Sequence, residues 1–277
     1  AAGRINEVLE TEVTVVDSKH IDDSKLQDVK GTLKFDNVSF TFNGADSPVL
    51  SNISFEAEAG KTTAIIGSTG SGKSTLLHLI PRYFDASEGE ISIDGVNIRD
   101  ISLNKLRDIL GFVPQKGVLF SGNIESNIKF ADENITDEQM KKAAEIAQAL
   151  EFINEKEDKF NSEISQGGSN VSGGQKQRLS IARALVKNPK ILLFDDSFSA
   201  LDYKTDVKLR KTLREEMSGV TTIIVAQRIA TILNADKIIV MNEGKIVGVG
   251  KHQELLETCP TYLEIAESQL SEEELQK

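Results

Sequence analysis

The chain has 277 residues, of which 39% are hydrophobic and 27% are charged, a balance typical of a globular protein with one domain divided into lobes. Its net charge of -11 argues against a nucleic-acid binder, because such proteins usually carry a basic face. The single cysteine, Cys259, excludes an internal disulfide and a cysteine metal cluster, and no apolar run approaches the ~20 residues that a membrane helix needs.

The N-terminal part is polar and differs in pattern from the rest. Ile5, Val8 and Leu9 have helical spacing, and an acidic stretch with few apolar residues follows to about residue 30. This stretch is typical of a linker. An amphipathic start with no hydrophobic partner nearby suggests that the chain continues upstream, so we expect residues 1–30 to lie outside the main domain.

Short strand-like runs follow this linker. Residues 32–42 and 49–55 are rich in apolar residues with strand-like spacing, and residues 90–95 alternate and end in Asp94-Gly95, a hairpin signal. We expect these pieces to form a small antiparallel sheet.

A glycine-rich segment matches the P-loop pattern G-x-x-x-x-G-K-[ST]. An apolar strand is predicted before it, at 62–66, and a helix after it, which Pro81 ends. In this order of strand, loop and helix, the loop can turn its N–H groups toward phosphate oxygens. Lys73 would then reach the β- and γ-phosphates, and the Ser74 hydroxyl would bind Mg²⁺. The alternative is a glycine turn that matches by chance. The predicted nucleotide-binding residues of this loop are Gly67, Ser68, Thr69, Gly70, Ser71, Gly72, Lys73, Ser74 and Thr75.

The middle of the chain, residues 100 to about 190, has mainly helical patterns. Residues 135–152 are predicted to form one helix that starts at Thr136. Further on, Val171 precedes an amphipathic helix over 176–187, and the start of that helix resembles a second phosphate cradle, although it can also be an ordinary N-cap at Ser172. Because one ATP does not need two cradles from one chain, we expect the second to serve a nucleotide on another chain. Its residues are Ser172, Gly173, Gly174 and Gln175.

The last third of the chain alternates strands and helices. Strands are predicted at 190–194, 221–225 and 237–241, with a helix at 205–217 between the first two, which indicates a parallel sheet covered on both faces. The first of these strands ends in Asp195, where P-loop ATPases keep an Mg²⁺-binding carboxylate. The three histidines (His20, His78 and His252) receive no functional role.

These motifs, in this order, resemble an ATP-binding cassette (ABC) ATPase domain over residues 31–260. The resemblance implies an α/β fold: a P-loop NTPase core with a parallel sheet, a small antiparallel β-subdomain, an inserted α-helical subdomain at about 116–190 and an acidic C-terminal helix or tail at 261–277. It also implies that two domains pair head to tail. Each ATP then lies between the P-loop of one domain and the Ser-Gly-Gly-Gln segment of the other.

The resemblance further assigns single residues. Phe42 stands where an aromatic ring stacks on adenine, although it can also be a core residue. Gln115 matches a glutamine that contacts Mg²⁺, with Ser74 and Asp195 as the other metal ligands, and residues 199–202 match a loop that touches the partner domain. Residues 117–128 and the N-terminal linker are similar to the corresponding segments of ABC exporters. The parent protein is therefore expected to be a membrane transporter, with this domain on the cytoplasmic face of the cell membrane and its helical subdomain against the transmembrane domains.

Two residues depart from the family pattern. Asp196 replaces the usual catalytic Glu, and Gln227, in the segment Val225-Ala226-Gln227-Arg228, replaces the usual His. Aspartate is one methylene shorter than glutamate, and glutamine cannot carry a proton. We therefore expect a degenerate site that binds ATP but hydrolyses it slowly, in a heterodimer with a different ABC chain. The alternatives are a homodimeric exporter, a module that uses ATP only for dimerisation, and a soluble ABC ATPase.

Overall fold

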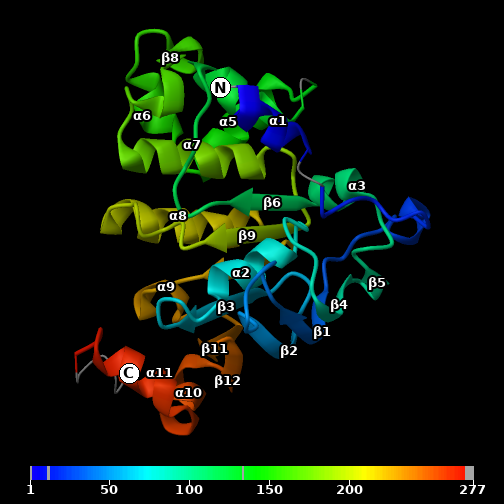
Figure 1. Cartoon of the computed structure of the whole chain (residues 1–277). Helices are drawn as coiled ribbons and strands as arrows, with labels where there is room; N and C mark the ends of the chain where they lie inside the picture. Colours follow the sequence, from blue (N-terminus) through cyan, green and yellow to red (C-terminus); the bar gives the residue numbers. More distant parts are fainter. Residues whose placement is uncertain (1, 11–12, 133, 272–277) are drawn as a thin grey trace.

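A computed structural model describes residues 2–10, 13–132 and 134–271 and divides the chain into three regions (Figure 1). A six-stranded sheet forms the centre. A four-stranded antiparallel sheet lies on one side of this central sheet, and a group of helices lies above the central sheet in the view. Glu272, Glu273 and Glu274 of the predicted acidic tail lie outside the described residues, as does the side chain of Val8.

The central sheet has the strand order β12-β11-β3-β10-β9-β6, with β12 antiparallel to β11 and all other neighbours parallel. The three predicted strands and the strand before the P-loop lie side by side in its middle, as β10, β3, β9 and β11. Its strands are β3 (Thr62–Gly67), β6 (Leu110–Val113), β9 (Ile191–Asp195), β10 (Thr221–Val225), β11 (Lys237–Asn242) and β12 (Lys245–Gly250).

The second sheet has the order β2-β1-β4-β5 and is antiparallel throughout, as the alternating pattern of its strands predicts. Asp94 and Gly95 form the β4–β5 turn, and both have positive φ angles (50° and 81°). A third, short pair joins β7 to β8. The strands are β1 (Leu33–Phe40), β2 (Leu50–Ala57), β4 (Glu88–Ile93), β5 (Val96–Asn97), β7 (Gly122–Asn123) and β8 (Glu163–Ile164).

Most of the described helices cover the central sheet or form the upper group in Figure 1. None of the described helices is both long and apolar enough to cross a membrane. The helices are α1 (Ala2–Glu10), α2 (Lys73–Leu79), α3 (Leu103–Asp108), α4 (Ile124–Ile128), α5 (Asp137–Ile146), α6 (Leu150–Asn154), α7 (Gly173–Leu185), α8 (Tyr203–Glu216), α9 (Ile229–Ile232), α10 (His252–Thr258) and α11 (Pro260–Glu267).

The buried strand β9 shows how the sheet separates two cores. Ile191 and Leu193 face a core that includes α2 and the antiparallel sheet, whereas Leu192 and Phe194 face a core built with α7 and α8. This alternation follows from the period of two along a strand, and burial on both faces explains why β9 is apolar throughout. Asp195 continues the first series, so its side chain lies on the α2 face.

One prediction about the middle of the chain is wrong. The single helix over 135–152 is two helices, α5 and α6, because Gln148 has a left-handed backbone (φ 56°) that ends the first. The Gln148 side chain donates hydrogen bonds to Glu145 O and to Thr212 Oγ1 on α8, and no glycine or proline marks the break. The region also contributes β6 to the central sheet, a strand too short to stand out from its helical neighbours.

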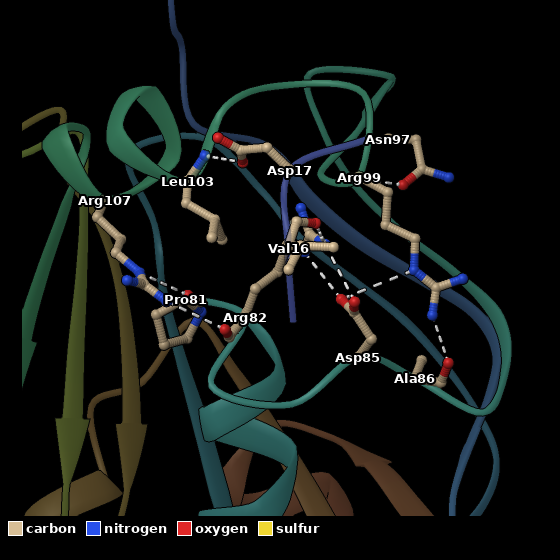
Figure 2. A network of polar contacts seen from close by, with 10 residues as sticks. All are labelled: Val16, Asp17, Pro81, Arg82, Asp85, Ala86, Asn97, Arg99, Leu103 and Arg107. Carbon is tan, nitrogen blue, oxygen red and sulfur yellow. Dashed lines mark hydrogen bonds and ion pairs between the residues drawn. The ribbon is translucent and has the colours of Figure 1, made fainter. Parts of the chain in front are cut away.

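Residues 13–26, here called the N-terminal strap, are fastened along the start of α3. The backbone N–H of Leu103 donates to Asp17 Oδ1 at 2.8 Å (Figure 2). The carboxylate of Asp23 accepts from both the N–H and the hydroxyl of Ser102, each at 2.8 Å. Two aspartates of the strap therefore satisfy free donors at a helix N-terminus, which stabilises both segments.

Arg82 connects the strap to the end of the P-loop helix. Its side chain is 3% exposed. The guanidinium binds Asp85 through Nε and Nη2, and Nη2 also donates to the carbonyl oxygen of Val16 at 3.1 Å (Figure 2). Arg107 on α3 donates to the carbonyl oxygens of Pro81 and Arg82, just after α2. The connection between α2 and β4 is thus held from two sides.

Candidate functional site

The glycine-rich loop between β3 and α2 can form only because two of its glycines have no side chain. A Cβ atom on Gly67 would lie 2.1 Å from the carbonyl oxygen of Met241, and one on Gly72, which has φ 93°, would lie 2.7 Å from Leu50 Cδ2. Residues 68–71 form the turn between them, and Thr75 lies in the first turn of α2. The loop therefore packs directly against β11 and β2, with its N–H groups at the start of a helix.

Lys73 is folded back into this loop. Its Nζ atom donates to the carbonyl oxygens of Gly67 (2.8 Å) and Ser68 (2.7 Å), and the residue is 8% exposed. Burial lowers the pKa of Lys73, while the carboxylates of Asp196 and Asp195 raise it. The Nζ atom also donates to Ser71 Oγ at 3.4 Å, so all its hydrogen-bond acceptors are neutral. Such an ammonium group is available to phosphate oxygens, which are stronger acceptors.

Ser74 on α2 and Asp195 at the end of β9 are in direct contact on the face of the sheet that α2 covers. The Ser74 hydroxyl donates to Asp195 Oδ1 at 2.7 Å, and the Asp195 side chain is nearly buried. The contact forms because α2 lies across β3, β10 and β9, and because Asp195 ends β9 on the α2 face. A hydroxyl beside a carboxylate is a suitable oxygen donor set for Mg²⁺, which proteins usually hold with one or two carboxylates and the phosphates of a nucleotide.

His78 also contacts Asp195, which the sequence reasoning missed. Its Nε2 atom lies 3.6 Å from Asp195 Oδ2, and its ring packs at tilted angles against Tyr83 and Phe112. The available signal was the spacing: His78 follows Ser74 by four residues, so both project from the same face of α2.

Asp196 and Gln115 meet at the carboxyl ends of β9 and β6, which are neighbouring parallel strands. Gln115 Nε2 donates to Asp196 Oδ2 at 3.2 Å. Asp196 is 8% exposed and has φ 45°, and its N–H donates to Val225 O at 2.9 Å. Burial raises the pKa of Asp196, although hydrogen bonds, first among them that from Gln115, oppose the effect. The carboxylate is therefore a better proton acceptor than an exposed aspartate.

Gln227 follows the neighbouring strand β10, and its side chain is exposed. Its backbone provides a further hydrogen bond that lowers the pKa of Asp196, so the two predicted catalytic positions are adjacent. Its carbonyl oxygen accepts a hydrogen bond of 2.8 Å from Gln269 Nε2, a residue at the far end of the chain that the sequence reasoning did not single out.

Phe42 lies just beyond β1 and is 39% exposed. Its ring makes edge-to-face contacts with Phe40 and Phe84, with ring centroids 4.8 Å and 5.3 Å apart. Phe40 is the buried member of the group, so the core position belongs to Phe40 and Phe42 keeps part of its ring free.

The segment 172–175 is a regular helix N-terminus on α7. Ser172 Oγ accepts from the N–H of Gln175, whose side chain accepts from the N–H of Ser172, forming a capping box. A Cβ atom on Gly173 would meet nothing within 4 Å, and one on Gly174 would be 3.6 Å from Ala200 O. Among the hydrogen bonds of the described residues, none joins this segment to the P-loop of the same chain.

The predicted site residues thus form two groups. Ser74 contacts Asp195, and Gln115 contacts Asp196, the next residue in the chain. The two carboxylates raise the pKa of Lys73, and the backbone of Gln227 forms a hydrogen bond with Asp196. The segment 172–175 belongs to the upper helices in Figure 1. A cavity of about 310 Å³ lined by Leu192, Phe194 and α8 residues opens on the other face of the sheet and includes none of the predicted site residues.

Comparison with known proteins gives the family context. A family model described as ABC transporter matches residues 50–199. An ABC transporter ATP-binding protein of Mycobacterium tuberculosis is 44% identical over 97% of this chain and 46% of its own length. An ATP-dependent lipid A-core flippase of Chromobacterium violaceum is 42% identical over 90% of this chain and 43% of its own length. A solved bacterial Atm1-family ABC exporter with ATP bound superposes with a TM-score of 0.91 at 36% identity, over 98% of this chain and 47% of that one. The chain spans about half the length of these relatives.

Proposed function

Because the chain belongs to the ABC transporter family, we propose that it is the ATP-binding and ATP-hydrolysing domain of an exporter, and that it dimerises on ATP to drive transport. The α/β P-loop fold and the expectation of ATPase activity follow from the family. The observation that carries the proposal is the contact between Ser74 and Asp195, next to the buried ammonium group of Lys73.

In this proposal the connected group of residues holds the nucleotide. The P-loop N–H groups and Lys73 bind the phosphates, and Phe42 stacks on the adenine with the free part of its ring. Ser74, Asp195 and Gln115 would hold Mg²⁺, which supplies charge neutralisation on the phosphate oxygens when bound. The Gln115 amide oxygen is available for this role, because the hydrogen bond to Asp196 uses the amide nitrogen.

The segment Ser172–Gln175 is proposed to complete the site of a second ABC domain. Gly173 supports this assignment, because its backbone is unstrained and its missing Cβ atom leaves open space. The fold of this chain does not require glycine there. A close approach by a nucleotide on another chain would require it.

The site is proposed to be the slow member of a pair. Asp196 is tied to Gln115, is one methylene shorter than glutamate, and must reach a water molecule to act as a base. The exposed side chain of Gln227 can orient a phosphate but cannot exchange a proton. A positioned base contributes ~10²–10⁴ in rate, so hydrolysis is weakened while the ATP-binding groups remain. We propose that a different ABC chain supplies the faster site, since a homodimer would repeat both substitutions.

The loops next to the upper helices carry a surface suited to the rest of the transporter. Phe120 and Phe130 stack with centroids 4.3 Å apart although they are 44% and 60% exposed, and Val118 beside them is 55% exposed. An exposed apolar cluster of this kind marks an interaction site. We propose that it receives the cytoplasmic ends of transmembrane domains, with residues 1–30 as the linker to them, at the cytoplasmic face of the membrane.

The test is ATP turnover against protein concentration for the native chain and for Asp196→Glu/Gln227→His. We expect slow native turnover, and a gain of about tenfold or more in the double variant with a rate that rises as dimers form. The matched control is Asp46→Glu/Gln253→His, which makes the same substitutions at exposed positions. Brisk turnover by the native chain would instead favour a homodimeric exporter.

A further inference from the structure

The side chain of Gln269 forms hydrogen bonds with the backbone of Gln227 and of Ile229. Its Nε2 donates to the carbonyl oxygen of Gln227 at 2.8 Å, and its Oε1 accepts from the N–H of Ile229 at 2.9 Å. A single amide group, just after α11, therefore contacts both the turn between β10 and α9, at Gln227, and the first residue of α9, Ile229. Glutamine suits this place because it offers both a donor and an acceptor.

This turn has few other anchors. Ala226 donates to Ile65 O on β3 at 3.0 Å, and the backbone of Gln227 forms a hydrogen bond with the side chain of Asp196, which follows β9. The exposed side chain of Gln227 makes no hydrogen bond with any other described residue. The direction of that side chain consequently depends on its backbone, and Gln269 contacts that backbone from the end of α11.

Gln269 is an exposed residue that follows a helix packed on the central sheet. Tyr262 and Ala266 on α11 are buried, and α11 packs on β11 and β3. The N–H of Gln269 donates to Ala266 O at 3.0 Å. Since β3 leads directly into the P-loop, α11 connects the turn at Gln227 to the strand that positions the phosphate-binding residues.

We propose that Gln269 is a positioning residue. Through it, α11 determines how close the side chain of residue 227 lies to the terminal phosphate of ATP. The inference rests on the proposed function, in which residue 227 faces that phosphate. Loss of both hydrogen bonds would let the turn move without removing any group that binds ATP. The maximal rate should then fall while nucleotide affinity is kept.

The experiment uses the full chain in the Asp196→Glu/Gln227→His background, for which we expect the faster turnover. Gln269→Met keeps the side-chain length and removes both hydrogen bonds, whereas Gln269→Glu keeps only the acceptor for Ile229. Gln253→Met on α10 is the matched control, because Gln253 is exposed and its side chain makes no hydrogen bond with any described residue. Two quantities are measured: kcat and KM for ATP, and hydrogen exchange of the Ile229 amide without nucleotide.

For Gln269→Met we expect kcat to fall about three- to tenfold with KM within about twofold, because two neutral hydrogen bonds are lost. The Ile229 amide should exchange faster. For Gln269→Glu the amide should remain protected while kcat still falls, because the contact with Gln227 is gone. The Gln253→Met control should match the background in both measurements.

Unchanged exchange at Ile229 in Gln269→Met would overturn the inference, as would an unchanged kcat or a rise in KM alone. Failure of the proposed function is distinguishable, because the background variant would then neither bind nor hydrolyse ATP. In that case the exchange measurement still decides whether Gln269 holds the turn.

Discussion

The hydroxyl of Ser74 lies 2.7 Å from Asp195 Oδ1, although 121 positions separate the two residues in the chain. One follows the P-loop lysine and the other ends a strand two places away in the sheet. Asp195 is not informative by itself, since apolar strands often end in aspartate. Their contact supports the proposal that Mg²⁺ binds at this position.

Ser74→Ala should weaken Mg²⁺-dependent ATP binding by about tenfold or more, because one oxygen ligand and one hydrogen bond of Asp195 are lost. The measurement is the ATP dissociation constant with Mg²⁺ and with a chelator. Ser218→Ala, at an exposed position after α8, is the control and should bind as the native chain does. Equal affinities for Ser74→Ala and the native chain in Mg²⁺ would contradict the assignment.

Lys73→Met should reduce ATP affinity by about one to two orders of magnitude, because charge-assisted hydrogen bonds contribute about 1.5–3 kcal/mol. The fold should persist, since the substitution removes a buried ammonium group whose pKa is lowered by burial. Binding titration and thermal unfolding on the same samples separate the two effects. Loss of folding together with binding would mean that Lys73 mainly stabilises the loop through Gly67 and Ser68.

Gly173→Ala should leave stability unchanged or raise it by up to about 1 kcal/mol, because alanine is the better helix former and the position is open. ATP-dependent dimerisation should nevertheless weaken. Gly67→Ala is the contrasting variant, because its Cβ atom would meet Met241 O and folding should suffer. Thermal unfolding and sedimentation with ATP measure both properties. Normal dimerisation of Gly173→Ala would argue against a role in a partner's site.

Arg82→Met should destabilise the fold by about 2 kcal/mol or more, because the buried guanidinium binds both Asp85 and the Val16 carbonyl. The measurement is the free energy of unfolding in urea. Lys34→Met, which breaks an exposed ion pair with Asp36, should cost less than about 1 kcal/mol. Similar losses in both variants would show that the strap contact adds little.

His252 should make stability depend on pH. Burial lowers its pKa below the usual 6.5, and its Nδ1 atom is 2.8 Å from the hydroxyl of buried Tyr262. The unfolded chain therefore takes up the proton first, so stability is full above about pH 6.5 and is lost as pH falls toward the folded pKa. Denaturation at pH 7.5 and 5.5 should show a smaller loss for His252→Gln than for the native chain. His20→Gln, at an exposed position, is the control.

Local patterns were enough to predict most of the elements and the fold class. Glycine and lysine at P-loop spacing, apolar strands with a period of two, and a serine N-cap before α7 all depend on neighbouring residues, so they can be read along the chain. The division of residues 135–152 could not be read in this way, because Gln148 takes its left-handed backbone without glycine or proline. Nor could β6, whose four residues form a strand only through pairing with β9.

The sequence also named the residues of the candidate site, but the contacts among them arise from packing between distant segments. Asp195 reaches Ser74 because the strand period places it on the face that α2 covers, and His78 joins them from the next helical turn. Gln269 reaches the turn at Gln227 from 42 residues away, and the Val16 carbonyl reaches Arg82 from 66. Such contacts depend on how the sheet and α11 pack, and burial, rather than any local pattern, determines that packing.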